Sequence, residues 1–137
     1  MLMLAACGKS SRQEPNEDTK TTDNPNQALY DQVMDVHNEV MPKSDQLYQL
    51  KKELQDKIAQ TPALPEYQKK QLHQIISELD SADRSMMDWM HKFRPLPDSV
   101  NQESAREYLE NEMEKIKKVR DLINGSLQKA KEEMEKK

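Results

Sequence analysis

Apolar residues recur at steps of three and four along three long stretches of this chain, and that spacing constrains the fold more than any other feature. Side chains spaced in this way line one face of an α-helix, whereas a strand would alternate at every second residue. The chain holds only two Gly, and 34% of its residues are charged while 4% are aromatic, a composition typical of long helices. The sequence therefore predicts an all-α fold.

The first periodic stretch covers residues 27–60, with Asn26 in the N-cap position. Its apolar face consists of Tyr30, Val33, Met34, His37, Val40, Met41, Leu47, Tyr48, Leu54 and Ile58. Pro42 lies inside this series and removes one backbone donor, so we expect a kink there. Because the apolar period continues across Pro42, a kinked single helix is favoured over two helices.

Two further helices are expected over residues 65–93 and 99–136. Pro65 suits the first turn of the second helix, and Ser99 with Gln102 fits a capping box at the start of the third. Three helices of this length joined by short loops predict an antiparallel up-down-up three-helix bundle.

The N-terminal part of the chain differs sharply from these periodic stretches. Residues 8–26 contain two Pro and no aliphatic or aromatic side chain, so they cannot bury enough apolar surface to offset the entropy lost on ordering. We expect a disordered tether there. The chain then divides into an export signal over residues 1–7, this tether, and a bundle over residues 27–137.

Cys7 is the only cysteine, and it follows Leu-Ala-Ala. The run LAAC resembles the lipobox of bacterial lipoproteins, in which an aliphatic and two small residues precede the Cys that receives the lipid. The stretch before Cys7 is shorter than a complete signal peptide and lacks Lys and Arg, so we expect the natural start to lie upstream. The resemblance implies a membrane anchor on lipidated Cys7 and a location in the cell envelope. It does not distinguish the outer membrane, the periplasmic face and the cell surface. A chance occurrence of the four residues is the alternative.

Three segments of the helical region carry a second resemblance: VMDVHNEVMPKSDQL, ADRSMMDWMHKF and EYLENEMEKIKKVRDLINGSLQKAKEE. Together they resemble a family of small helical bacterial lipoproteins of unknown function, often labelled "viral A-type inclusion protein". The resemblance covers most of residues 28–133, and ADxxMMDWM is its most specific motif. It implies a location and a fold rather than an activity.

Three ionisable residues fall on otherwise apolar helix faces: His37, Asp83 and Glu112. The antiparallel arrangement would place Asp83 and Glu112 at about the same height, with His37 within one or two turns of them. A buried carboxylate is costly unless it is paired or hydrogen-bonded. The three residues therefore indicate a polar layer that sets the helix register, positions at the bundle edge, or a metal or ligand site.

Methionine side chains offer a second candidate metal site. Met34, His37 and Met41 share one face of the first helix and would lie near Met86 and Met90 of the second. Thioether and imidazole groups suit Cu(I), although Met also fills irregular cores. A periplasmic protein that binds copper or a divalent cation is therefore the alternative function.

Enzyme signatures are missing from the sequence. Two Gly are too few for a Gly-rich phosphate loop, the only Cys is the expected lipid site, and neither HExxH nor ExxH occurs. The net charge is −4 with both signs interspersed, which argues against nucleic acid as a partner. We expect a non-catalytic protein without a cofactor.

Trp89 is the only Trp and lies at the margin of the second helix's apolar face. An exposed Trp there could anchor a partner protein. The favoured alternative is that it closes the core against Tyr30, the turn at residues 95–97 and Tyr108. The expected function is an interaction or structural module of the cell envelope, with an unidentified protein partner or a second copy paired as a coiled coil.

Overall fold

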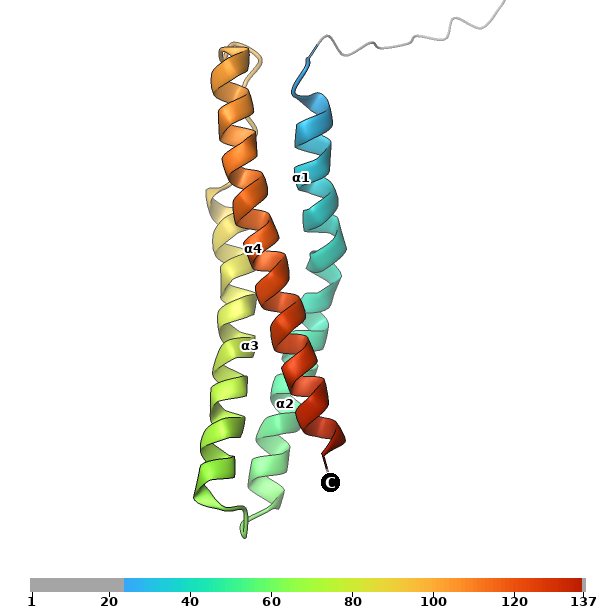
Figure 1. Cartoon of the computed structure of the whole chain (residues 1–137), viewed down its shortest axis with the longest axis vertical. Helices are drawn as coiled ribbons and strands as arrows, with labels where there is room; N and C mark the ends of the chain where they lie inside the picture. Colours follow the sequence, from blue (N-terminus) through green and yellow to red (C-terminus); the bar gives the residue numbers. More distant parts are fainter. Residues whose placement is uncertain (1–23, 137) are drawn as a thin grey trace, which may run out of the picture.

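The computed structural model describes residues 24–136 and shows an antiparallel three-helix bundle within them. The elements are α1 (Gln27–Val40), η1 (Met41–Lys43), α2 (Ser44–Gln60), α3 (Glu66–Lys92) and α4 (Gln102–Glu135). α1, η1 and α2 follow one another as a single long arm, α3 returns beside them, and α4 runs parallel to the first arm (Figure 1). The predicted all-α, up-down-up architecture is confirmed.

The expected kink at Pro42 takes the form of a short 3₁₀ turn. The α1 hydrogen bonds end with the Met41 N–H donating to the carbonyl of His37, and Pro42 then occupies the start of η1. Proline has no N–H to continue the α-helical pattern, and a 3₁₀ turn accommodates the lost bond. The arm is therefore two α-helices joined without a change of overall direction, rather than one kinked α-helix over residues 27–60.

The start of α4 differs from the prediction. Its N-cap is Asn101, whose side-chain oxygen accepts from the N–H groups of Glu103 at 2.9 Å and Ser104 at 3.3 Å. Ser99 instead lies in a turn closed by the Val100 N–H and the Pro97 carbonyl. The capping box at Ser99 is therefore wrong, because Asn101, two residues further along the chain, caps the helix instead.

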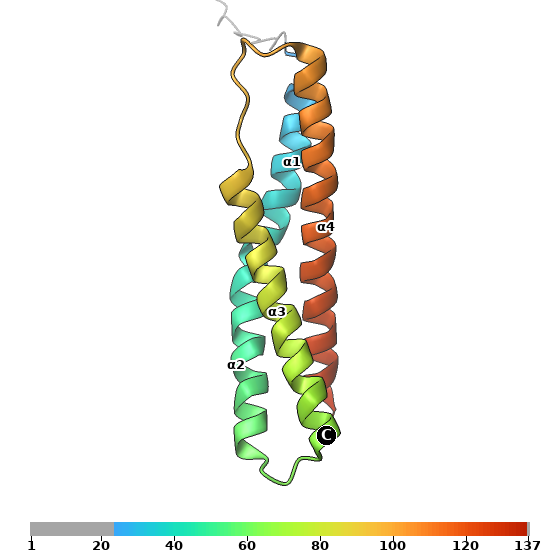
Figure 2. The same cartoon turned by 90° about the vertical axis from the view of Figure 1, so that its left-hand side faces the viewer.

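This later start lengthens the connection between α3 and α4. Residues 93–101 contain no helix and rise along the bundle from the end of α3 to its top, where α4 begins (Figure 2). A non-helical chain advances roughly 3.3 Å per residue, more than twice the rise of a helix. The connection therefore carries the start of α4 far above the end of α3 and shifts the register between the two helices.

Hydrogen bonds between elements hold this register. Between α3 and α4, the Ser126 hydroxyl donates to the Glu78 carbonyl at 3.4 Å, and the Tyr108 hydroxyl accepts from the Arg94 N–H at 2.9 Å. Between the first arm and α4, the Lys43 ammonium donates to the Asn124 side-chain oxygen at 2.7 Å. Asn26 does occupy the N-cap of α1, but its side chain makes no cap bond. Its amide donates to the Gln102 carbonyl at 2.9 Å instead, which joins the starts of α1 and α4.

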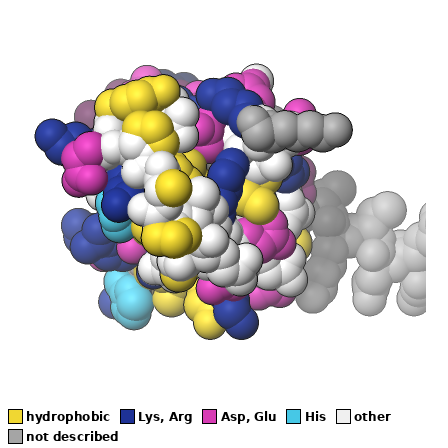
Figure 3. Space-filling model, turned by 90° about the horizontal axis from the view of Figure 1, so that it is seen from below, with side chains coloured by type: hydrophobic (Ala, Val, Ile, Leu, Met, Phe, Trp, Pro, Cys, Tyr) yellow, Lys and Arg dark blue, Asp and Glu magenta, His cyan; other side chains and the backbone are white. Residues whose placement is uncertain are grey.

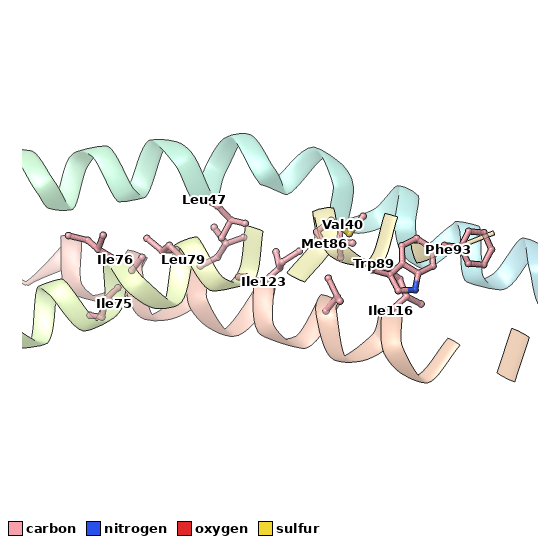
Figure 4. Packing of buried hydrophobic residues seen from close by; sticks show 14 of the residues in the cluster. Val40, Leu47, Ile75, Ile76, Leu79, Met86, Trp89, Phe93, Ile116 and Ile123 are labelled. Carbon is pink, nitrogen blue, oxygen red and sulfur yellow. The ribbon is translucent and has the colours of Figure 1, made fainter. Parts of the chain in front are cut away.

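The interior changes character along the bundle. Aliphatic side chains from α2, α3 and α4 fill the half that holds the α2–α3 turn, whereas Met86 and Trp89 of α3 and Phe93, which follows α3, lie in the other half (Figure 4). The core residues are Val33, Val40, Leu47, Leu54, Leu72, Ile75, Ile76, Leu79, Ala82, Met86, Trp89, Phe93, Leu109, Met113, Ile116, Val119, Ile123, Leu127 and Ala130. These follow the apolar faces that the three- and four-residue spacing predicted.

Candidate functional site

Asp83 and Glu112, which were predicted to lie at about the same height, lie at different heights along the bundle. Ser126 of α4 is level with Glu78 of α3. Glu112 lies roughly 21 Å above Ser126 along α4, whereas Asp83 lies roughly 8 Å above Glu78 along α3, at 1.5 Å per residue. Asp83 and Glu112 are thus about 13 Å apart along the bundle axis by the same rise. The expected common height is wrong because residues 93–101 climb the bundle before α4 starts.

Glu112 is the buried member of this set. Its carboxylate accepts a hydrogen bond from the Lys115 ammonium at 2.8 Å, and only 7% of the Glu112 side chain is exposed against 62% for Lys115. The hydrogen bond and the charge of Glu112 raise the pKa of Lys115 above its ordinary value of 10.5. Its own helix thus supplies the partner for this buried carboxylate, as a buried charge requires.

His37 and Asp83 occupy the bundle edge instead. Both are half-buried. One ring nitrogen of His37 lies 3.0 Å from the Asn38 side-chain oxygen, and its ring centroid lies 5.9 Å from that of Trp89. Within residues 24–136 no three His, Cys, Asp or Glu side chains gather in a way that could hold a metal ion. The predicted metal set of His37, Asp83 and Glu112 is therefore not assembled.

The methionines of the copper hypothesis contribute to the apolar interior. Met86 is fully buried, and Met34, Met41 and Met90 are partly buried against the core. These contacts are what unbranched, polarizable side chains make when they fill an irregular core. A thioether site with His37 stays a prediction, and it would require Met86 to leave the core contacts that it makes.

Trp89 lies inside the bundle, as one member of an aromatic cluster that is centred on Phe93. Only 6% of the residue is exposed. Its ring stacks on Phe93 at a centroid distance of 4.8 Å, and Phe93 in turn lies 6.1 Å from Tyr108 and 6.2 Å from Tyr30. Trp89 as a partner contact is therefore wrong, because the ring does not reach the surface. The alternative was that Trp89 closes the core against Tyr30, the turn at residues 95–97 and Tyr108. The two tyrosine rings lie against Phe93, which itself stacks on Trp89.

One feature of the aromatic cluster lies beyond sequence reasoning. The Trp89 indole nitrogen is buried and has no hydrogen-bond partner within the described part of the chain. Buried Trp N–H groups usually find a partner. Only packing in three dimensions could reveal this orphaned donor, because a hydrogen-bond partner could have come from any of the helices.

The sequence analysis also missed a hollow at the end of the bundle where α1 and α4 both start. Its volume is about 630 Å³. Tyr30 and Leu109 line it from the helices, Leu96 and Val100 from the connection, and several side-chain amides surround them. The one available signal was Pro95 and Pro97, which prevent a helix there and leave an irregular wall.

The opposite end of the bundle has a different surface. In the view onto that end, positive and negative side chains are interspersed around apolar ones (Figure 3). Tyr67, at the start of α3, is 68% exposed. None of the helices in residues 24–136 combines the length and apolarity needed to cross a membrane. Cys7 lies outside the described residues.

Comparisons with known proteins leave the family of this chain open. No family model, no curated protein and no solved structure matches it.

Proposed function

We propose that this protein is a lipid-anchored, non-catalytic module of the bacterial cell envelope, attached to the membrane through Cys7. The observation that carries the proposal is the run Leu-Ala-Ala-Cys at residues 4–7, which ends in the only cysteine of the chain. Residues 8–23 then separate this cysteine from the first described residue, Asn24. The lipobox resemblance and the spacing together support an anchor followed by a tether.

The geometry of the bundle suits such an attachment. The chain enters the bundle at the end where α1 begins, and α4 starts at the same end (Figure 1). A helix of 34 residues, the length of α4, spans about 51 Å. An anchor on Cys7 would therefore hold the bundle by one end and present the α2–α3 turn, with Tyr67 nearby, to other envelope components.

An interaction or structural role accords with what occupies the interior. Aliphatic and aromatic side chains fill the core, and Glu112 is paired with Lys115 on its own helix. The ionisable side chains that could have met in an active or metal site are separated along the axis. The helix surfaces carry charges of both signs, and Tyr48 and Tyr67 are exposed on them. Such a surface suits the binding of a partner protein.

Replacement of the anchor residue tests the proposal. Cys7→Ser should move the protein from the membrane fraction to the soluble fraction and remove the mass of the lipid from the intact protein. Ser10→Ala, three residues away, is the matched control and should remain in the membrane fraction. An unchanged distribution of the Cys7→Ser protein, or an unmodified mass of the wild-type protein, would overturn the anchor.

A further inference from the structure

The hollow between the starts of α1 and α4 has the size and lining of a small-molecule site. Its volume of about 630 Å³ falls within the range of roughly 300–1,000 Å³ typical of ligand pockets. Tyr30, Leu109 and Ala105 form an apolar floor on the two helices, and Leu96 and Val100 add an apolar wall from the connection. Such a lining would remove an aliphatic chain from water.

Among the polar groups of the hollow, Asn26 offers a hydrogen-bond acceptor to a ligand. Asn26 lines the hollow and is only 6% exposed. Its amide group donates to the Gln102 carbonyl at 2.9 Å, and its backbone N–H donates to the Asn24 side-chain oxygen at 3.0 Å. The Asn26 side-chain oxygen accepts no hydrogen bond from residues 24–136, so it is open to a donor on a ligand.

Charge narrows the class of ligand. Asp98 is the charged residue of the lining, and its carboxylate makes no ion pair within the described residues, while neither Lys nor Arg lines the hollow. The starts of α1 and α4 would favour an anion, but Asn101 already accepts from two amide groups at the start of α4. A cationic donor satisfies both Asn26 and Asp98, whereas an anion satisfies neither.

We propose that this hollow binds a primary ammonium group carried on an aliphatic chain. The chain lies against Tyr30, Leu96 and Leu109, and the ammonium donates to the Asn26 side-chain oxygen and faces the Asp98 carboxylate. The proposal is independent of the lipid anchor. The ammonium could come from a soluble amine or from the ethanolamine headgroup of a membrane lipid, because both present the same group next to an aliphatic body.

Calorimetric titrations of the full chain with hexylamine, octylamine and decylamine test this assignment. The amine concentrations are kept below those at which these amines form micelles. Each added methylene should tighten binding about fourfold until the hollow is filled. Octanoate, with a carboxylate head on an aliphatic body, should bind at least tenfold more weakly than octylamine. Octanoate that binds as tightly as octylamine, or the absence of any dependence on chain length, would overturn the proposal.

Variants of the lining locate the binding. Ala105→Leu places a larger side chain in the hollow on a helix that tolerates it and should weaken octylamine binding at least tenfold. Ala59→Leu, at an exposed position near the far end of the bundle, is the matched control and should bind as the wild type does. Asp98→Asn should weaken binding about threefold, since the carboxylate is exposed. Equal binding by the Ala105→Leu protein, with its helix content intact by circular dichroism, would overturn the location.

Vesicles then distinguish the two sources of the ammonium. A Cys7→Ser chain that cosediments with phosphatidylethanolamine vesicles, but not with phosphatidylcholine vesicles or when it carries Ala105→Leu, supports a lipid headgroup. Binding of octylamine without cosedimentation supports a soluble amine. Failure of both measurements overturns the proposal and leaves the anchor on Cys7 untouched.

Discussion

The two halves of the bundle fill their interiors with different kinds of side chain. Around the α2–α3 turn, three helices face one another, and aliphatic residues such as Leu54, Leu72 and Leu79 fill the space between them. Toward the start of α1, residues 93–101 take the place that a third helix would occupy, and aromatic rings fill the interior. A non-helical segment lacks a continuous apolar face, so bulky rings from neighbouring elements must cover the gap.

The comparison shows that apolar periodicity predicts the buried residues of a bundle well only where every segment around the core is a helix. In the aliphatic half, the spacing of apolar residues alone predicts which side chains point into the core. In the aromatic half the same spacing left Trp89 at the margin of its helix, although the ring is buried. Its neighbour Phe93 directly follows α3, and Phe93 in turn meets Tyr108 of α4. The approach of Phe93 and Tyr108 depends on the path of the connection.

The largest expected effects compare one core residue from each half. Trp89→Ala should lower the free energy of unfolding by about 4 kcal/mol and Leu79→Ala by about 3 kcal/mol, measured by urea denaturation followed by circular dichroism. Trp89→Phe keeps a ring and removes the orphaned N–H, so it should cost less than about 1.5 kcal/mol. A Trp89→Ala protein as stable as the wild type would show that the aromatic half is not a packed core.

The connection between α3 and α4, which lies in the aromatic half, ends at the cap of α4. Asn101→Ala should lower the free energy of unfolding by about 1 kcal/mol, because the N–H groups of Glu103 and Ser104 lose their acceptor. Ser99→Ala is the control and should leave stability within about 0.5 kcal/mol of the wild type. Thermal denaturation of the two variants side by side would contradict this cap if Ser99→Ala proved the more damaging.

A single glycine can be used to strengthen α4 outside the aromatic half. Gly125 lies within the helix, and a Cβ added there would meet no other atom within 4 Å. Gly125→Ala should therefore raise the free energy of unfolding by about 1 kcal/mol through the better helix propensity of Ala. A lower melting temperature for this variant would show that the glycine is needed for a contact or a movement.

The smallest effect concerns charge in the aromatic half. Because Glu112 raises the pKa of Lys115, their pairing adds stability that is fully present below pH 10.5 and is lost as the pH rises through the higher folded-state value. In Glu112→Gln the pKa of Lys115 should fall back toward 10.5, as followed by NMR titration of the lysine side chain. Glu110→Gln, an exposed carboxylate on the same helix, should leave it unchanged.

Much of the fold could be predicted because its determinants are local. Helix content, the position of the irregularity at Pro42 and the inward positions of residues such as Val33 and Ile116 follow from propensity, from a missing N–H and from the helical period. The prediction favoured a kinked single helix there, whereas the structure has two helices joined by a 3₁₀ turn. The capping residue of α4 was missed because both Ser99 and Asn101 are good N-caps, and only their geometry decides between them.

The candidate polar site failed for a different reason. Glu112 was predicted on an apolar face and is buried, but its expected neighbour Asp83 lies about two helical turns away along the axis. A helical wheel gives the direction of each side chain around its helix and contains no information about height. An error in the length of one connection therefore moves every partner across the α3–α4 interface.

The sequence by itself determined three apolar helix faces, their order along the chain and the presence of a single cysteine in a lipobox-like run, because each of these is written in neighbouring residues. Only the tertiary structure decided which side chains meet. The rise of residues 93–101, the cap at Asn101 and the hydrogen bonds between elements set the helix register. That register separates His37, Asp83 and Glu112, assembles the aromatic cluster around Phe93, and opens the hollow where α1 and α4 begin.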